Sequence, residues 1–320
     1  MDPPGVVELA DVSRVTRRRV LVWGLGTVAA CVGAGALGTE LVSRGVLPGH
    51  QVLLDIEGAC AVPVSKLVDS RLGPAFSGRF FSHARRRTVG YTLAYPPGHG
   101  PGSDLPLVVA LHGYGANHTD VLSGMSPAQA LALELDGAPL PPMALVTVDG
   151  GGGYWHSHRG DDPMGMVVDE LIPMCRARGL GRPPQLVGIM GVSMGGYGAL
   201  LMAEKHPQLF AAVAAISPAV WTTYAAAAGA NAGAYSSADD FATNDAVTHA
   251  GALAHTPVRV ASGSSDPFHP GVVALAKVLP AGSVVVISKG CHTGPFFQSQ
   301  EPPSLAFLAH HLTAGHDLGA

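Results

Sequence analysis

A serine in a glycine-rich turn is the first residue of this chain whose type and setting could do chemistry. Ser193 lies in a Gly-x-Ser-x-Gly pattern over residues 191–195, directly after an apolar run and before a stretch that favours a helix. A serine on such a turn projects its hydroxyl above a sheet, with a helix N-terminus behind it where developing negative charge is favoured. Because the chain has 42 glycines among 320 residues, the pattern alone is weak, and its placement predicts Ser193 as a nucleophile.

An acid and a base follow Ser193 on two later turns. Asp266 comes directly after an apolar run at 258–261, and His292 follows the next run at 284–287. In this order His292 would take the proton of Ser193 and return it to the leaving group, while Asp266 would fix the tautomer of the imidazole. The less well placed alternatives are Asp239, Asp240 and Asp245 for the acid and His269 for the base.

Alternating strands and helices must position these residues. Short apolar runs predict buried strands at 105–111, 144–148, 185–190, 212–216, 258–261 and 284–287, and helix-compatible stretches lie at 127–135, 164–178, 198–206 and 271–278. This alternation predicts an α/β fold with a mostly parallel central sheet and helices on both faces. Two strands at 79–82 and 88–95 precede it, and residues 219–250 fit neither pattern, so we expect them to form an excursion, or lid, over the active-site edge.

The sequence around Ser193 resembles the esterase D and antigen 85 group of α/β-hydrolases, which includes mycobacterial esterases. The shared pattern covers residues 191–200 (GVSMGGYGAL) and continues to Ile216-Ser217-Pro218, within a resemblance that spans residues 85–310. The resemblance implies an α/β-hydrolase fold. With the predicted triad, we expect hydrolysis of a carboxylic ester through an acyl-Ser193 intermediate, without a metal or an organic cofactor.

The tetrahedral intermediate of that reaction needs two backbone N–H donors. Met194, the residue after the nucleophile, supplies one of them. His112 and Gly113 begin a His-Gly-Tyr-Gly sequence that resembles the His-Gly loop of lipases and esterases, and Tyr114 in it supplies the other. We expect His112 and Gly113 to border the substrate pocket. His112 is expected to be structural rather than a second base.

A second glycine-rich loop spans residues 149–156. It lacks the Gly-Lys-Ser/Thr ending of a phosphate-binding loop, so nucleotide binding is a weak interpretation. In the resembled family a comparable loop borders the pocket, which implies that Tyr154 and Trp155 contact substrate. The alternative is a flexible turn with one aromatic side chain in the core.

Two rival functions fit the same residues. In an acyltransferase, a sugar or lipid alcohol replaces water, as in the mycolyltransferases of the antigen 85 group. Those enzymes have glutamate as the acid and lack the His-Gly loop, so Asp266 favours an esterase. A non-catalytic envelope protein could keep the fold for binding, although an intact Ser-Asp-His set argues against it.

Residues 1–40 predict export. Arg14 and the arginines at 17–19 precede an uncharged apolar stretch at 20–38, close to the ~20 residues that cross a bilayer. The stretch resembles a twin-arginine signal with a cleavage candidate at 34–36; a lipidated Cys31 or an uncleaved membrane anchor are the alternatives. Each alternative places the catalytic domain outside the cytoplasm, secreted to the cell envelope or anchored there.

Composition and cysteine spacing limit the remaining possibilities. The net charge of −4 and the lack of a basic stripe beyond the N-terminal third argue against a nucleic-acid partner. We expect a linker at 41–75, one catalytic domain at 76–315, and a small-molecule or lipid acyl ester as partner. The cysteines lack zinc-site spacing, and a disulfide is permitted without a predicted pairing among Cys60, Cys175 and Cys291.

Overall fold

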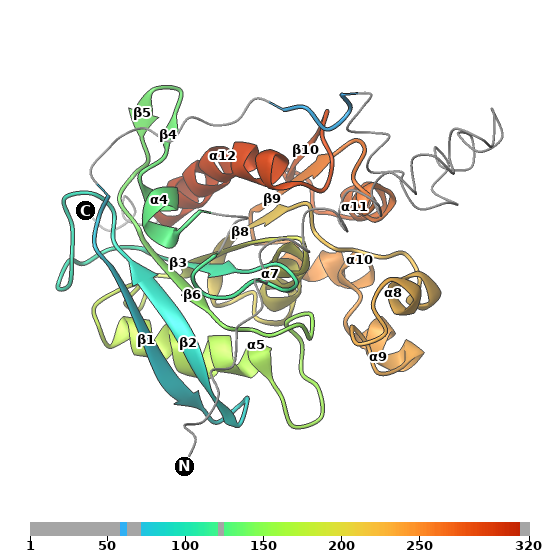
Figure 1. Ribbon diagram of the computed structural model, residues 1–320, viewed down its shortest axis with the longest axis horizontal. Helices are drawn as coiled ribbons and strands as arrows, with labels where there is room; N and C mark the ends of the chain where they lie inside the picture. The colour runs from blue at the N-terminus through green and yellow to red at the C-terminus, as the bar shows by residue number, and fades with distance from the viewer. Residues whose placement is uncertain (1–57, 63–71, 121–124, 314–320) are drawn as a thin grey trace, which may run out of the picture. The chain divides into compact units, whose positions relative to one another are not determined.

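The computed structural model describes residues 58–62, 72–120 and 125–313 (Figure 1). The chain divides into compact units at 1–58 and 59–320, and the helices and strands described belong to the second unit. The predicted export segment with Cys31, and most of the predicted linker, lie outside the described residues. Within the described ranges, no helix combines the length and the apolar character that a membrane span requires.

An eight-stranded sheet forms the centre of this unit. In spatial order its strands are β1 (Ala75–Ser82), β2 (Arg87–Ala94), β6 (Ala144–Val148), β3 (Leu107–Leu111), β7 (Val187–Val192), β8 (Phe210–Ile216), β9 (Val258–Gly263) and β10 (Val284–Ser288). The first two strands are antiparallel to their neighbours, and the six from β6 to β10 are parallel. The predicted α/β fold with a mostly parallel sheet is therefore confirmed.

The central strands are apolar throughout because both of their faces are covered. Within β3, Leu107 and Val109 belong to one core cluster, whereas Val108 and Ala110 belong to the other. This alternation is the two-residue period of a strand with helices on each side. Burial on both faces explains why these strands read as continuous apolar runs.

Helices form the two outer layers (Figure 1). One face packs against α4 (Pro127–Leu131) and α12 (Gly294–Thr313). The other face packs against five helical elements: α5 (Pro163–Gly165), the π-helical segment η2 (Met166–Leu171), α6 (Ile172–Arg176), α7 (Met194–Lys205) and α11 (His269–Ala276). Because parallel strands end at one edge, the loops after β3, β6, β7, β9 and β10 meet there.

Two sequence expectations about helices are wrong. The stretch 127–135 is helical only to Leu131, because Asp136 and Gly137 both have positive φ and turn the chain between β4 (Glu134–Leu135) and β5 (Ala138–Pro139). Asp-Gly is a pair that favours such a hairpin turn. The helix expected at 198–206 begins earlier, at Met194, and is buried on all sides as far as Glu204, so it has no polar face.

The segment after β8 folds as short helices. They are α8 (Tyr224–Ala230), α9 (Ala238–Thr243), α10 (Ala246–His249) and a 3₁₀ turn η3 (Ala250–Leu253). The side chains of Thr223, Ser237 and Asp245 cap the first three, each accepting from a backbone N–H. Aromatic residues of this segment join the core, so the segment packs against the sheet-bearing part of the same unit.

Candidate active site

Ser193 stands at the sharp turn between β7 and α7. Its φ of 56° and ψ of −119° are unusual for a residue with a side chain, and its N–H donates to the carbonyl of Ile216 at 2.9 Å. A Cβ on Gly191 would collide with the backbone of Gly195, and one on Gly195 would collide with the carbonyl of Leu111. Both flanking glycines are therefore required by close backbone approach.

The structure brings the three residues predicted as nucleophile, base and acid into one chain of contacts. Nε2 of His292 lies 2.8 Å from Oγ of Ser193, and Nδ1 of His292 lies 2.9 Å from Oδ2 of Asp266. Because a carboxylate only accepts, Nδ1 of His292 carries the proton and Nε2 is free to accept one from the serine. This arrangement can activate a serine hydroxyl.

The acid is buried and the base is partly exposed. The side chain of Asp266 is 0% exposed and that of His292 is 20% exposed. Oδ1 of Asp266 also accepts from the N–H of Phe268 at 2.8 Å, which fixes the carboxylate in place. The carboxylate is thus fixed on the buried side of His292, and the imidazole reaches solvent on the other side. Proton transfer to or from an external substrate needs this arrangement.

The alternative acids and the alternative base lie elsewhere. Asp245 caps α10, Asp239 is exposed in the first turn of α9, and Asp240 is 3.7 Å from His156. His269 begins α11, three residues beyond Asp266. None of these four side chains has a recorded hydrogen bond to Ser193 or His292 among the described residues.

The two predicted oxyanion donors flank Ser193. Met194 opens α7, where its N–H has no partner within the helix. On the other side, a Cβ on Gly113 would lie 3.6 Å from Cβ of Ser193, which shows how closely the loop before Tyr114 approaches the nucleophile. No hydrogen bond from the N–H of Tyr114 or Met194 is recorded among the described residues, so both can donate to a substrate oxygen.

His112 and Trp155 hold this loop from beneath. Nε2 of His112 accepts from the N–H of Gly150 at 2.9 Å, its Nδ1 lies 2.7 Å from the carbonyl oxygen of Gly113, and burial lowers the pKa of the ring. The indole N–H of Trp155 donates to the carbonyl of His112 at 3.2 Å. His112 is 2% exposed and Trp155 is 0% exposed. Neither ring reaches the surface, so the expected substrate contacts of both are corrected, whereas the structural role also expected of His112 agrees with its hydrogen bonds.

The glycine-rich loop after β6 is a packing element. A Cβ on Gly150 would collide with the ring of Trp155, so the loop folds directly onto that indole. Tyr154 is also buried, packs near Tyr197 and Trp221, and has its pKa raised to about 12 by burial. The sequence alternative of one aromatic side chain in the core fits this loop better than substrate contact, although both aromatic side chains are buried.

Aromatic side chains that sequence reasoning did not single out surround the base. The rings of Phe268 and Phe297 lie 5.1 Å and 4.9 Å from that of His292. Trp221, from the segment after β8, lies 5.3 Å from Phe268. Phe268 and Phe297 border the site because they follow Asp266 and His292 closely in the sequence. Trp221 lies near it because it follows β8, the strand next to β7. This apolar setting suits an acyl or aryl group.

A disulfide joins the loop of the base to the start of the described chain. Cys60 and Cys291 are bonded, 231 residues apart, with Cα atoms separated by 4.9 Å. Cys291 directly precedes His292, so the bridge restrains the position of the imidazole. Cys175 is free and buried, and burial raises the pKa of its thiol to about 12.

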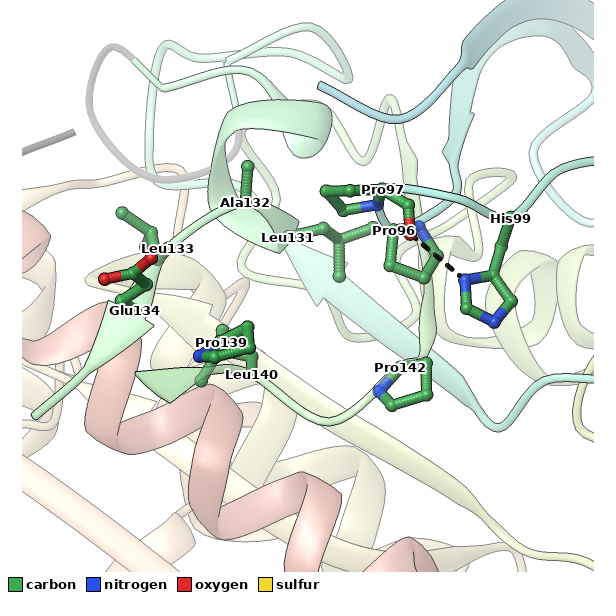
Figure 2. A pocket seen from close by; sticks show the side chains of 10 residues that line it. All are labelled: Pro96, Pro97, His99, Leu131, Ala132, Leu133, Glu134, Pro139, Leu140 and Pro142. Atoms are coloured by element: carbon green, nitrogen blue, oxygen red, sulfur yellow. Dashed lines mark hydrogen bonds between the residues drawn. The ribbon is translucent and has the colours of Figure 1, made fainter. Parts of the chain in front are cut away.

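A cavity between the β4–β5 hairpin and the end of β2 is separate from this site (Figure 2). Its lining is mainly proline and leucine side chains, among them Pro96 and Leu131, with His99 at one side. Pro142, also in the lining, precedes β6, so the cavity lies at the edge where the parallel strands begin. Ser193 and its partners lie at the opposite edge, where these strands end.

Comparison with known proteins gives one family match and many structural ones. A sequence model of the family Esterase, described as "Putative esterase", matches residues 82–277. No curated protein sequence matches the chain.

Three similar solved structures are distant from this chain in sequence. A ferulic acid esterase is 17% identical with a TM-score of 0.65, over 75% of this chain and 99% of that one. An S-formylglutathione hydrolase from Agrobacterium tumefaciens is 17% identical with a TM-score of 0.59, over 78% and 100%. FphF, a fluorophosphonate-binding serine hydrolase from Staphylococcus aureus, is 14% identical with a TM-score of 0.60, over 75% and 99%. At such identity these likenesses establish a shared fold.

Proposed function

The chain belongs to the Esterase family, and from this premise we propose that it is a serine carboxylesterase in which Ser193, His292 and Asp266 form the catalytic triad. One observation carries the proposal. The hydroxyl of a serine with φ of 56° lies 2.8 Å from a histidine whose other nitrogen lies 2.9 Å from a buried carboxylate. A serine hydroxyl has no comparable reactivity without such a base.

Acylation begins with the attack of Oγ of Ser193 on the ester carbonyl carbon. His292 takes the hydroxyl proton at Nε2, and Asp266 stabilises the resulting imidazolium. The N–H groups of Tyr114 and Met194 donate to the oxyanion. When the intermediate collapses, the bond to the alkoxy oxygen breaks, His292 protonates that oxygen, and the alcohol departs.

Deacylation repeats the steps with water as the nucleophile. His292 takes a proton from water as the oxygen attacks the acyl-Ser193 carbonyl, and then returns the proton to Oγ as the carboxylic acid leaves. Only the polar groups of the triad and two backbone donors are used. The proposed reaction is therefore hydrolysis of a carboxylic ester to an acid and an alcohol.

The substrate class follows from what surrounds the base. Phe268, Phe297 and Trp221 make an apolar border, which fits an ester with an aryl or medium-length acyl group. The names of two similar structures, a ferulic acid esterase and an S-formylglutathione hydrolase, support small acyl substrates. A panel of p-nitrophenyl esters with acyl groups of increasing length, and methyl ferulate, would rank these possibilities by kcat/KM.

Action outside the cytoplasm is part of the proposal. The arginines ahead of the apolar stretch at 20–38 predict export, and the Cys60–Cys291 disulfide supports it because such bonds persist in oxidising compartments. Cell fractionation with an antibody to the catalytic unit tests this. Protein confined to the cytoplasm with both thiols free would contradict it.

Labelling with a fluorophosphonate tests the triad directly. We expect one adduct per folded chain, mapped to Ser193 and lost in Ser193→Ala and strongly slowed in His292→Ala. Ser264→Ala, a change at an exposed serine two residues before Asp266, is the matched control and should label normally. Folded protein that binds esters but forms no adduct would favour a non-catalytic binding protein.

Product analysis separates hydrolysis from acyl transfer. In a hydrolase, added glycerol or trehalose should leave the free acid as the main product. Transfer of most acyl groups to the added alcohol would favour the acyltransferase instead. Both outcomes keep the acyl-Ser193 intermediate, so they leave the labelling result unchanged.

A further inference from the structure

Two histidines and an aspartate converge away from the triad, between the loop after β6 and helix α9. One ring nitrogen of His156, one of His158 and one carboxylate oxygen of Asp240 all lie within 4.8 Å of one another. Nδ1 of His156 and Oδ1 of Asp240 are 3.7 Å apart. In a tetrahedral zinc site with bonds of ~2.0–2.1 Å, neighbouring donor atoms are about 3.4 Å apart. The three groups thus need only a small closing movement to share one cation.

The hydrogen bonds of the histidines set the tautomers that coordination requires. Nε2 of His156 lies 2.8 Å from the carbonyl oxygen of Ala234, and Nε2 of His158 lies 2.7 Å from that of Gly153. A carbonyl only accepts, so Nε2 of His158 carries the proton and its Nδ1 keeps a lone pair. Nδ1 of His156 also lies 3.3 Å from the carbonyl oxygen of Ser157, and the shorter contact of Nε2 with Ala234 favours the same tautomer in that ring. A backbone carbonyl behind the other ring nitrogen is the usual support of a metal-binding histidine.

The carboxylate is held in a similar way. Oδ2 of Asp240 accepts from the N–H and the hydroxyl of Ser236 at 2.8 Å and 2.9 Å. Oδ1, the atom nearest His156, accepts at 2.9 Å from the side-chain amide of Asn244. The same amide nitrogen of Asn244 also lies 3.4 Å from Nδ1 of His156. The amide therefore holds these two atoms near each other, and a cation that binds both must displace it.

A cavity of about 360 Å³ opens beside the cluster and gives a cation access. His156 and Asp240 contribute to its lining, together with the carboxylates of Asp162 and Asp169 and the ammonium of Lys205. The three carboxylates exceed the single ammonium, which favours a cation at this place. The cavity also has room for the water ligands that would complete a coordination shell, at ~30 Å³ each.

We propose that His156, His158 and Asp240 form a binding site for a divalent transition metal such as Zn²⁺, which ties the segment after β8 to the loop after β6. The site is distinct from the catalytic triad and is not needed for the chemistry of Ser193. Its effect is structural, because it adds to the hydrogen bonds by which Ala234 and Asn244, on either side of α9, already contact His156. Tyr235, stacked on His156 at 5.2 Å, extends the tie to the aromatic core.

Zinc titration of the full chain tests this site. The protein is treated with EDTA, dialysed, and titrated with ZnSO₄ by calorimetry at neutral pH, with zinc content then measured by mass spectrometry. We expect one zinc per chain at this site, with affinity lowered at least ~10-fold in His158→Gln and in Asp240→Asn. Glutamine at 158 can still donate to Gly153, so loss of binding would reflect the lost ligand.

Control variants separate this site from the other histidines of the chain. His255→Gln and Asp239→Asn change exposed residues of the same types and should bind zinc as the wild type does. Zinc should also raise the melting temperature of the wild type and the controls, and leave that of His158→Gln unchanged.

Three results would overturn the proposal. They are no stoichiometric zinc in the wild type, equal zinc affinity in His158→Gln and the wild type, or zinc-dependent stabilisation that survives in both ligand variants. A hydrogen-bonded cluster that binds no metal is the competing explanation of the geometry. It predicts that zinc leaves the melting temperature of the wild type unchanged.

Discussion

Oγ of Ser193 lies 2.8 Å from Nε2 of His292, although the two residues are 99 positions apart in the sequence. The sharp turn after β7 and the loop after β10 bring them together, although β8 and β9 lie between those two strands in the sheet. The hydroxyl therefore depends on the lengths of two separate loops for its alignment.

Replacement of Ser193 by alanine should remove the nucleophile without disturbing the fold. We expect kcat on a p-nitrophenyl ester to fall by ~10⁴-fold or more, with an unchanged melting temperature, because the side chain packs little. Steady-state kinetics and thermal unfolding measure both. Activity near that of the wild type would remove Ser193 from the mechanism.

The acid and the base should differ in their contributions. His292→Ala should lower kcat by ~10⁶-fold and Asp266→Asn by ~10⁴-fold, because asparagine can still hold the ring but no longer stabilises the imidazolium. Asp239→Asn, an exposed change, is the control. If Asp266→Asn retained full activity, the acid would have to be sought among Asp239, Asp240 and Asp245.

Trp155→Phe should affect catalysis without a substrate contact. The change removes the indole donor to the carbonyl of His112 and loosens the loop that carries Tyr114. One neutral hydrogen bond of ~1 to 1.5 kcal/mol corresponds to a decrease of about 10-fold in kcat. KM should stay constant, and a rise in KM alone would return Trp155 to the role of substrate contact.

Loss of the Cys60–Cys291 disulfide should weaken both stability and activity. Cys60→Ser should lower the free energy of unfolding by ~2–4 kcal/mol and reduce kcat, since the loop of His292 loses its restraint. Dithiothreitol should destabilise the wild type but not the variant. Cys175, with its thiol pKa raised to about 12, should stay unalkylated by iodoacetamide in both. Equal stability of the two proteins without reductant would contradict the prediction.

Glu204 predicts how stability depends on pH. Burial, with a smaller effect of Asp245, raises its pKa from 4.5 to about 9. Below pH 4.5 the carboxyl group of Glu204 is protonated in both the folded and the unfolded chain, so it does not lower the free energy of unfolding. Between these pKa values the unfolded chain loses the proton that the folded chain keeps, so stability falls as pH rises.

Glu204→Gln should remove this dependence. The variant should match the wild type near pH 4.5 and exceed it by ~2–4 kcal/mol at pH 7, at about 1.4 kcal/mol per pKa unit. Urea unfolding at the two pH values measures the difference. Asp104→Asn, at an exposed position, should show no such gain, and an identical pH profile for Glu204→Gln and the wild type would contradict the assignment.

The sequence predicted best the features that depend on local patterns. Buried parallel strands are continuous apolar runs, so 144–148 coincides with β6, and the turns that end β7, β9 and β10 carry the predicted serine, aspartate and histidine. The glycines around Ser193 have a steric requirement that can be read without coordinates. Chain order then supplied a geometry consistent with the proposed triad.

Features that depend on tertiary contacts could not be predicted from the sequence. Helix α12 contains Pro302 and Pro303, which normally end a helix, and burial against the sheet outweighs that preference. The pairing of Cys60 with Cys291 joins residues 231 apart, and no spacing rule predicts it. The burial of Trp155 depends on Gly150 and Gly198, whose lack of side chains leaves room for the indole.

The helices α8 to α10 form an insertion that donates no strand to the sheet. They lie in the connection between β8 and β9, whereas Ser193, Asp266 and His292 lie in other connections. A graft of residues 219–253 from another esterase would therefore leave the connections that carry these three residues unchanged. The graft would have to include partners for Tyr154, His156, Tyr197 and Lys205, because these residues of the framework contact the segment.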